Sequence, residues 1–214
     1  MAGRIQRLQA FDRECSRAGE LVLAGVDEAG RGCWAGPVVA AAVMLPADWC
    51  PAGLDDSKKL SPARREDLFG KIRTGALVWG ACAVSAGVID ERNILAATLQ
   101  AMAGAVARLR RLPDLLLVDG LQVPDVACPA RALVRGDGTS AAIAAASVVA
   151  KVLRDRVMVV WDRHYPGYGF AGHKGYGAPV HRRALAELGP CPLHRTSFRP
   201  VASLAQADLW NGSC

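Results

Sequence analysis

The chain has 214 residues, of which 51% are hydrophobic and 21% charged, and its formal net charge at pH 7 is +6. This length supports one well-packed core, and the composition is that of a globular protein, not a disordered or membrane-embedded one. Apolar runs such as Val38 to Leu45 are far shorter than the roughly 20 residues that a spanning helix needs. Because residues 1–20 also lack the apolar core of a secretory signal, we expect a cytoplasmic protein with no membrane partner.

The cysteines and the net charge narrow the function only a little. Seven cysteines are scattered along the chain, and no two of them form a C-x-x-C pair. Neither a zinc site nor a disulfide framework follows from this spacing, so we expect free thiols. The positive charge favours a polyanionic partner without identifying one.

In chain order, the hydrophobic pattern predicts strands and helices that alternate. Strands are predicted at 21–26, 37–45, 76–86, 115–118 and 131–135. Helices are predicted at 4–17, from Pro62 after an N-cap at Ser61, at 88–112 up to Pro113, and at 141–165 after a cap at Thr139 or Ser140. This order predicts an α/β fold of three layers, a mixed sheet of about five strands flanked by helices. We expect one catalytic domain over 1–214, in which about 165–214 form a glycine-rich loop and a short C-terminal helical extension.

Four carboxylates are predicted at strand ends. Asp27 and Glu28 end the first strand, Asp119 ends a central strand, and Asp137 follows the last one. Side chains beyond the carboxyl ends of strands in an α/β sheet converge on one crevice. Such a cluster repels itself unless cations neutralise it, and hard oxygen ligands suit Mg²⁺ or Mn²⁺. One or two such ions would activate a water and stabilise the leaving oxygen in a phosphoryl displacement.

Simpler interpretations of these segments stay open. Asp119-Gly120 and Asp137-Gly138 are common turn dipeptides, and Asp137 could merely precede a helix cap. Two glycine patterns are less ambiguous. Residues 25–32 have phosphate-loop spacing but lack its lysine and Ser/Thr, and residues 167–172 match G-x-G-x-x-G but follow Pro166 and not a strand. We therefore reject both nucleotide-binding interpretations.

Several longer stretches, taken together, indicate a family. They occur in the order AGVDEAGRG, AGPVVAAAV, DDSKKLS, IDERNILAAT, LLLVDG, VRGDG, IAAASVVAKVLRDR, YGFAGHKGYG and HRTSFRPV. In these stretches the chain resembles bacterial ribonuclease HII, a type 2 ribonuclease H, along nearly its whole length. The resemblance implies a ribonuclease H-like fold and an endonuclease that hydrolyses the RNA strand of RNA–DNA hybrids. It also implies cleavage 5′ of single ribonucleotides in duplex DNA, leaving a 3′-hydroxyl and a 5′-phosphate, and a role in removing ribonucleotides from DNA.

The resemblance also assigns roles to particular residues. The family's metal-binding acids fall on Asp27, Glu28, Asp119 and Asp137, and would hold one or two Mg²⁺ or Mn²⁺ ions. The residues that would bind substrate are Gly30, Arg31, Gly32, Lys58 and Tyr176. Within that set the glycine-arginine-glycine motif would read the 2′-hydroxyl, the only group that distinguishes RNA from DNA at a single nucleotide. The lysine would contact a phosphate, and the tyrosine would lie near the ribonucleotide-to-deoxyribonucleotide junction. We expect a monomer whose partner is an RNA–DNA hybrid or a ribonucleotide-containing duplex.

Other polar residues receive weaker interpretations. Four residues fit either of two interpretations equally well, a contact with a backbone phosphate or a solvated surface position: Lys59, His173, Lys174 and Arg195. Ser147 and Lys151 lie one turn apart on a helix of small residues, and we interpret them as packing and solvation. Asp155 is expected to pair with Arg154, Arg156 or a neighbouring helix.

Two other classes of function compete with this interpretation. A non-catalytic hybrid-binding protein would use the basic surface and the glycine-arginine-glycine loop alone, but a negative cluster gives a polyanion binder no advantage. Another metal nuclease of the ribonuclease H fold would act on DNA without a 2′-hydroxyl sensor. An all-DNA duplex would then be cut as well as one that contains a ribonucleotide.

Overall fold

The computed structural model describes residues 3–203 and contains a five-stranded mixed sheet. The strand order is β3-β2-β1-β4-β5. The strands are β1 (Leu23–Ala29), β2 (Val38–Met44), β3 (Val78–Val84), β4 (Leu115–Asp119) and β5 (Ala130–Leu133). Pairing is antiparallel between β1 and β2 and between β2 and β3, and parallel between β1 and β4 and between β4 and β5. The predicted α/β class with a mixed sheet is confirmed.

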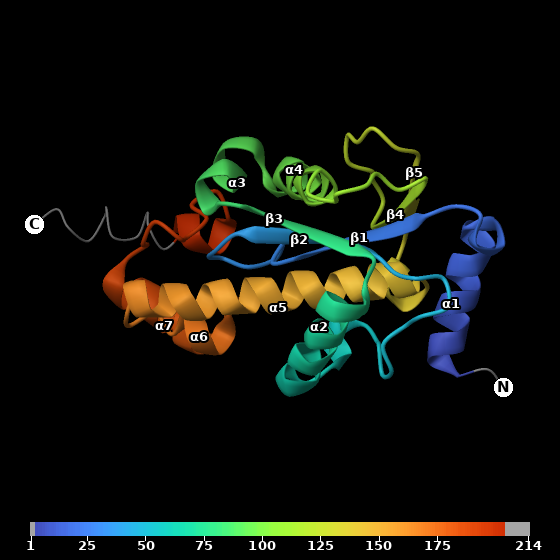
Figure 1. Cartoon of the computed structure of the whole chain (residues 1–214). Helices are drawn as coiled ribbons and strands as arrows, with labels where there is room; N and C mark the ends of the chain where they lie inside the picture. Colours follow the sequence, from blue (N-terminus) through green and yellow to red (C-terminus); the bar gives the residue numbers. More distant parts are fainter. Residues whose placement is uncertain (1–2, 204–214) are drawn as a thin grey trace, which may run out of the picture.

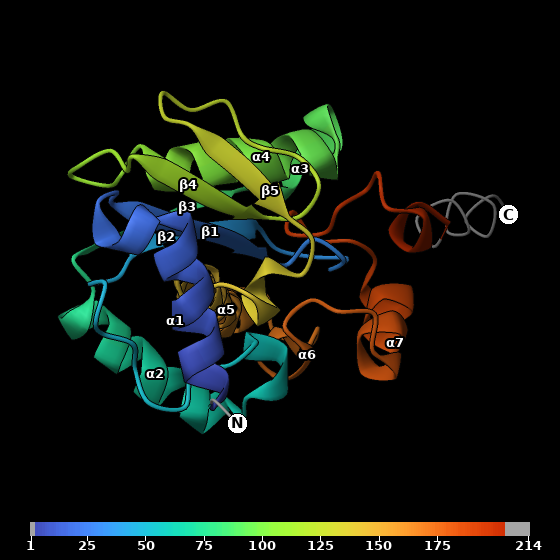
Figure 2. The same ribbon diagram turned by 90° about the vertical axis from the view of Figure 1, so that its right-hand side faces the viewer.

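Helices cover both faces of this sheet (Figure 1). They are α1 (Arg4–Cys15), α2 (Pro62–Gly75), α3 (Ala86–Arg92), α4 (Ile94–Val106), α5 (Ala141–His164), α6 (Phe170–His173) and α7 (Pro179–Leu188). In Figure 1, α3 and α4 lie above the sheet, and α2 and α5 lie below it. The view in Figure 2 looks along α5 and shows the same three layers, with α6 and α7 on the α5 side.

The two central strands, β1 and β2, are buried on both faces. Residues with even numbers, such as Ala24 and Val26, pack in the core beneath α4, whereas Ala41 and Val43 pack toward α2 and α5. Gly25 explains how closely α5 approaches β1. A Cβ atom at this position would lie 2.2 Å from backbone atoms of Ala142 and Ile143, so only glycine lets the helix lie directly on the strand.

The region 88–112 differs from its prediction as one helix. It forms two helices, α3 and α4, which meet at Asn93 with φ of 70°. The Asn93 side chain accepts hydrogen bonds at 3.0 Å from the N–H groups of Leu95 and Ala96, and thus caps α4. Periodicity alone did not reveal this break, because the apolar spacing continues across a capping residue that turns the chain. The second helix also ends at Val106, before Pro113.

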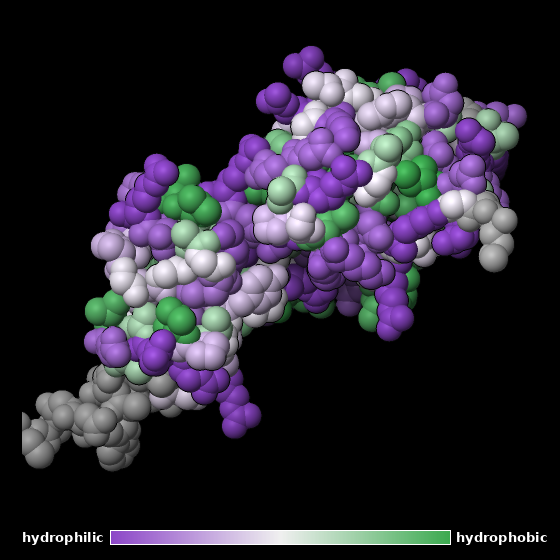
Figure 3. All heavy atoms as spheres, turned by 90° about the horizontal axis from the view of Figure 1, so that it is seen from below, coloured by the Kyte–Doolittle hydropathy of each residue, from purple (hydrophilic) through white to green (hydrophobic). Residues whose placement is uncertain are grey.

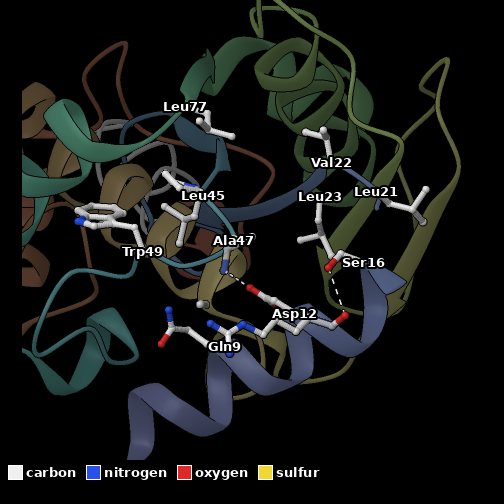
Figure 4. Close-up of a pocket in the computed structure, with 14 residues that line it drawn as sticks. Gln9, Asp12, Ser16, Leu21, Val22, Leu23, Leu45, Ala47, Trp49 and Leu77 are labelled. Atoms are coloured by element: carbon white, nitrogen blue, oxygen red, sulfur yellow. Dashed lines mark hydrogen bonds between the residues drawn. The ribbon is translucent and has the colours of Figure 1, made fainter. Parts of the chain in front are cut away.

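The surface seen from the α5 side is mostly hydrophilic, and its hydrophobic residues form small separate patches (Figure 3). Within residues 3–203, no helix is both long enough and apolar enough to span a membrane. A cavity of about 180 Å³ lies between α1 and the ends of β1 and β2, and Figure 4 shows the residues around it, including Asp12 and Trp49. The organisation of 1–214 as one domain stays a prediction, and its C-terminal part, 204–214, lies outside the described residues.

Candidate active site

The strand ends bring three of the four predicted acids to one place. Val26 of β1 lies opposite Val118 of β4, and the pairing of these two parallel strands ends there. The next residues, Asp27 and Asp119, therefore lie side by side. Asp27 is only 4% exposed. The Asp119 Oδ1 atom accepts a hydrogen bond of 2.7 Å from the Gly136 N–H, which holds the 3₁₀ turn that carries Asp137 against the end of β4. The predicted convergence of these segments thus has a direct backbone cause.

The pKa values show that the four carboxylates share one electrostatic environment. Burial raises the pKa of Asp27 well above its usual value, and the charges of Glu28 and Asp119 raise it further. Burial also raises the pKa of Glu28, against the opposing effect of Arg31, and Asp119 adds to the rise. The pKa of Asp137 is raised by burial and again by Asp119. The charge of Asp119 therefore acts on the other three acids, and the four form one acidic cluster.

This acidic cluster has the chemistry of a divalent-cation site. The Glu28 Oε2 atom is buried and has no hydrogen-bond partner, which is costly for a carboxylate unless a cation occupies that direction. The Arg31 Nη1 atom lies 3.5 Å from Glu28 Oε1 and compensates only part of the negative charge. Hard carboxylate oxygens suit Mg²⁺ and Mn²⁺. Within the described residues, however, no group of three or more His, Cys, Asp or Glu side chains is arranged to hold a metal ion, so these carboxylates suit a divalent cation by their chemistry but do not form a closed ligand set in this structure.

Two basic side chains lie beside the acidic cluster. The Arg31 side chain is 47% exposed, and Lys58 is exposed at the end of a short 3₁₀ turn. Burial lowers the pKa of Lys58, but the charges of Asp27 and Asp137 outweigh this effect and raise the pKa overall. The lysine therefore stays charged while it faces the acids.

The two glycines beside Arg31 lie in different structural environments. Gly30 is buried with φ of +97°, and a Cβ atom there would lie 1.9 Å from Arg154 Nε. Gly32 is exposed, and a Cβ atom there would meet nothing within 4 Å. The expected close approach to a sugar is therefore open only at Gly32, whereas Gly30 is required by the packing beneath the loop.

Tyr176 lies beside this loop, between cations and a thiol. Its side chain is partly exposed, and the Lys151 Nζ atom lies 5.5 Å from the ring centroid. Burial raises the pKa of its hydroxyl, and the neighbouring Cys33 thiol raises it further. Lys151 also forms a 2.8 Å ion pair with Asp155. The interpretation of Lys151 as a solvated residue is wrong, because this side chain is held between an acid and an aromatic ring.

The sequence did not reveal the structural roles of two further residues, Ser147 and Arg195. The hydroxyl groups of Ser57 and Ser147 are 2.7 Å apart, and Ser147 opposes the rise in the pKa of Asp27. Its interpretation as a packing residue is therefore incomplete. Arg195, considered as a surface or phosphate contact, is fully buried, which makes that interpretation wrong. No local sequence pattern indicated these roles, because the hydrogen bonds of Ser147 and Arg195 join segments far apart in the chain.

Comparisons with known proteins agree with this fold. Among solved structures, the ribonuclease H2 from Pyrococcus horikoshii OT3 covers 86% of this chain and 97% of its own length, with a TM-score of 0.75 and 26% identity. The RNase HII in the PCNA:RNase HII complex from Archaeoglobus fulgidus matches with a TM-score of 0.68 and 30% identity, covering 85% of this chain and 96% of that one. Bst-RNase HIII in complex with Mn²⁺, at 16% identity and a TM-score of 0.69, covers 87% of this chain and 70% of its own and shares the fold. The structure therefore has the ribonuclease H fold.

Sequence comparisons define the family within this fold. A model of the ribonuclease HII family matches residues 24–201. The ribonuclease HII of Syntrophotalea carbinolica is 54% identical over 191 residues, which cover 89% of this chain and 91% of that protein. That of Geobacillus kaustophilus is 53% identical over 205 residues, covering 96% and 78%. The chain belongs to the ribonuclease HII family, and it is an endonuclease of the hydrolase class.

Proposed function

We propose that this ribonuclease HII cuts the RNA strand of RNA–DNA hybrids and the 5′ side of single ribonucleotides in duplex DNA, leaving 3′-hydroxyl and 5′-phosphate ends. The observation that supports this proposal most is the acidic cluster of four carboxylates beside the exposed residues Arg31 and Gly32. A site that only bound a polyanion would gain nothing from these acids. The same proposal gives the enzyme a role in removing ribonucleotides from DNA.

We assign the acids to a divalent cation. Asp27, Glu28 and Asp119 would hold one or two Mg²⁺ or Mn²⁺ ions, and Asp137 would complete the set. A phosphate oxygen of the substrate would supply a further ligand, as is common for Mg²⁺. A bound ion lowers the pKa of a water and stabilises the oxygen that leaves phosphorus. The relief of repulsion among the acids supports this assignment, and the Mn²⁺ complex of Bst-RNase HIII, which shares the fold, agrees with it.

The remaining side chains orient the substrate and the acids. Arg31 and Lys58 carry positive charge beside the acidic cluster, where they would bind phosphate oxygens next to the scissile bond. Ser147, which opposes the rise in the pKa of Asp27, would orient this carboxylate. Tyr176 offers its exposed ring to the sugar that follows the ribonucleotide. The exposed backbone at Gly32 would lie against the 2′-hydroxyl.

The broader setting follows from the substrate. We propose that the enzyme acts in the cytoplasm, where it would meet DNA that contains ribonucleotides. We further propose that one chain is sufficient for cleavage, because all assigned residues come from residues 27–176 of a single chain.

A comparison of matched duplexes tests this function. One duplex carries a single ribonucleotide, and its twin is entirely deoxyribonucleotide. With Mg²⁺ or Mn²⁺, we expect one cut 5′ of the ribonucleotide, with a 3′-hydroxyl and a 5′-phosphate, and an intact twin. Equal cutting of both duplexes would support a DNA nuclease instead, and binding without cleavage at any metal concentration would support a hybrid-binding protein.

A further inference from the structure

Arg195 is a fully buried arginine that none of the roles above explains. Its Nη2 atom donates to the carbonyl oxygens of Gly30 at 2.7 Å and Gly36 at 2.9 Å, and its Nη1 atom donates to the carbonyl oxygen of Arg31 at 2.8 Å. The Nε atom donates to Gly36 as well, at 3.0 Å. Within residues 3–203, Arg195 forms no ion pair with a carboxylate. All four hydrogen bonds go to the main chain of the loop that carries the glycine-arginine-glycine motif.

Burying an unpaired guanidinium is unfavourable, so this arrangement needs an advantage elsewhere. Burial lowers the pKa of Arg195 to about 10, which leaves the side chain charged at neutral pH. Its planar fork reaches three carbonyl groups at once, which a lysine ammonium on a flexible stem does not reproduce. The benefit is a loop with a fixed backbone, since hydrogen bonds from a charged donor are stronger than neutral ones.

His194, the residue before Arg195, is connected through hydrogen bonds to Tyr176, the other element that we assign to substrate binding. The Cys191 N–H donates to His194 Nδ1 at 2.9 Å, so the proton of this ring is on Nε2, which lies 3.0 Å from His181 Nε2. His181 Nδ1 in turn lies 2.8 Å from the Tyr176 carbonyl oxygen and donates to it. These contacts form one ordered chain of donors that ends on the main chain of Tyr176.

A third contact anchors this segment to α3. The Asp90 carboxylate accepts hydrogen bonds of 2.8 and 3.0 Å from the backbone N–H groups of Thr196 and Ser197, and it also accepts bonds from both hydroxyl groups. The backbone N–H of Arg195 donates to the Trp34 carbonyl at 2.8 Å. Residues 194–197, which we call the clasp, therefore connect α3, the loop at 30–36 and Tyr176.

We propose that Arg195 and His194 are positioning residues, which hold the glycine-arginine-glycine loop and Tyr176 at one fixed separation and thereby set the preference for a ribonucleotide over a deoxyribonucleotide. The inference rests on the proposed function, because it assigns these two elements to the substrate. A loop that moves relative to Tyr176 still binds phosphate through Arg31. It loses the contact at the 2′-hydroxyl, because that contact requires close approach of the backbone.

The test compares the binding of two labelled duplexes by fluorescence anisotropy without divalent ions, one with a single ribonucleotide and the other all-deoxy. The readout is the dissociation constant of the all-deoxy duplex divided by that of the ribonucleotide-containing duplex. This ratio is measured for wild type, Arg195→Lys and the control Ile72→Val. Ile72 is a fully buried residue of α2 in a hydrophobic cluster with residues of α5, and none of residues 194–197 belongs to that cluster. Its truncation lowers stability without touching the loop. We expect Arg195→Lys to reduce the ratio about tenfold, because it loses hydrogen bonds from a charged donor, while Ile72→Val leaves the ratio unchanged.

Two further variants make the test independent of the folding of Arg195→Lys. His194→Leu removes the donor to His181 and should reduce the same ratio, and His194→Gln, which keeps an N–H donor, should restore part of it. Unchanged ratios in Arg195→Lys and His194→Leu, or a loss no larger than that in Ile72→Val, would overturn the inference. Failure of wild type to cut the ribonucleotide-containing duplex would instead contradict the proposed function, so the two failures are distinguishable.

Discussion

Asp12 on α1 is predicted to make the stability of the protein depend on pH. Its Oδ2 atom accepts a hydrogen bond of 2.9 Å from the Ala142 N–H in the first turn of α5, next to the cavity in Figure 4. Burial raises the pKa of this carboxyl from 3.8 to about 6. The folded state therefore binds a proton more tightly than the unfolded state does, and the protonated acid favours folding.

The sign and the size of the effect follow from this shift. The stabilisation from Asp12 is complete below about pH 3.8 and is lost as the pH rises to about 6. A rise of about two pKa units corresponds to about 3 kcal/mol at most. The variant Asp12→Asn keeps an oxygen that accepts from Ala142 but does not titrate, so its stability should lack this component.

The assay is urea unfolding of wild type and Asp12→Asn at several pH values between 4 and 7. Burial lowers the pKa of His194 to about 4, which makes stability rise with pH in the same range. This opposing effect is present in both proteins and cancels in their difference. We expect the free energy of unfolding of wild type, relative to Asp12→Asn, to fall by about 2–3 kcal/mol from pH 4 to pH 7. Equal pH dependence of the two proteins would refute this reasoning.

Two further predictions concern packing and metal binding. Gly25→Ala should lower the free energy of unfolding by about 1–3 kcal/mol or more, since its Cβ would collide with the backbone of α5, and a change under 0.5 kcal/mol in urea unfolding would contradict this. Mn²⁺ at ten times its dissociation constant should add about 1.4 kcal/mol, or roughly 3–6 °C in melting temperature. The shift should be absent in Asp119→Asn and unchanged in Asp125→Asn, an exposed control; equal shifts in both variants would place the ion elsewhere.

Local patterns were sufficient for the elements that carry the acids. The apolar run of β1 ends in Asp27 and Glu28. Of the two caps that the sequence offers, Thr139 and Ser140, it is Ser140 that starts α5, with its hydroxyl 3.2 Å from the Ile143 N atom. Strand ends and helix caps depend on neighbours in sequence, and these are visible in the chain itself. The convergence of Asp27 and Asp119 followed from the general rule for α/β sheets.

The supporting contacts could not be predicted in this way. Arg195 lies 165 residues from the Gly30 carbonyl that it holds, and Ser147 lies 90 residues from its partner Ser57. An arginine in HRTSF has the same local pattern whether it faces solvent or a buried loop. The break at Asn93 was missed for a different reason, because its capping role competes with an uninterrupted apolar period. Tertiary hydrogen bonds decided the positions of Arg195 and Ser147, whereas a local helix cap decided that of Asn93.

The most direct test of the central claim is single-turnover cleavage of a duplex with one ribonucleotide by wild type and Asp27→Asn, with Mg²⁺ and with Mn²⁺. Asp27 is buried at the end of β1, where Glu28 and Asp119 raise its pKa, so asparagine fits the fold but removes a ligand charge. We predict a folded variant whose cleavage rate falls at least a hundredfold with either ion. Full activity of Asp27→Asn would contradict the account of these four acids as a divalent-cation site.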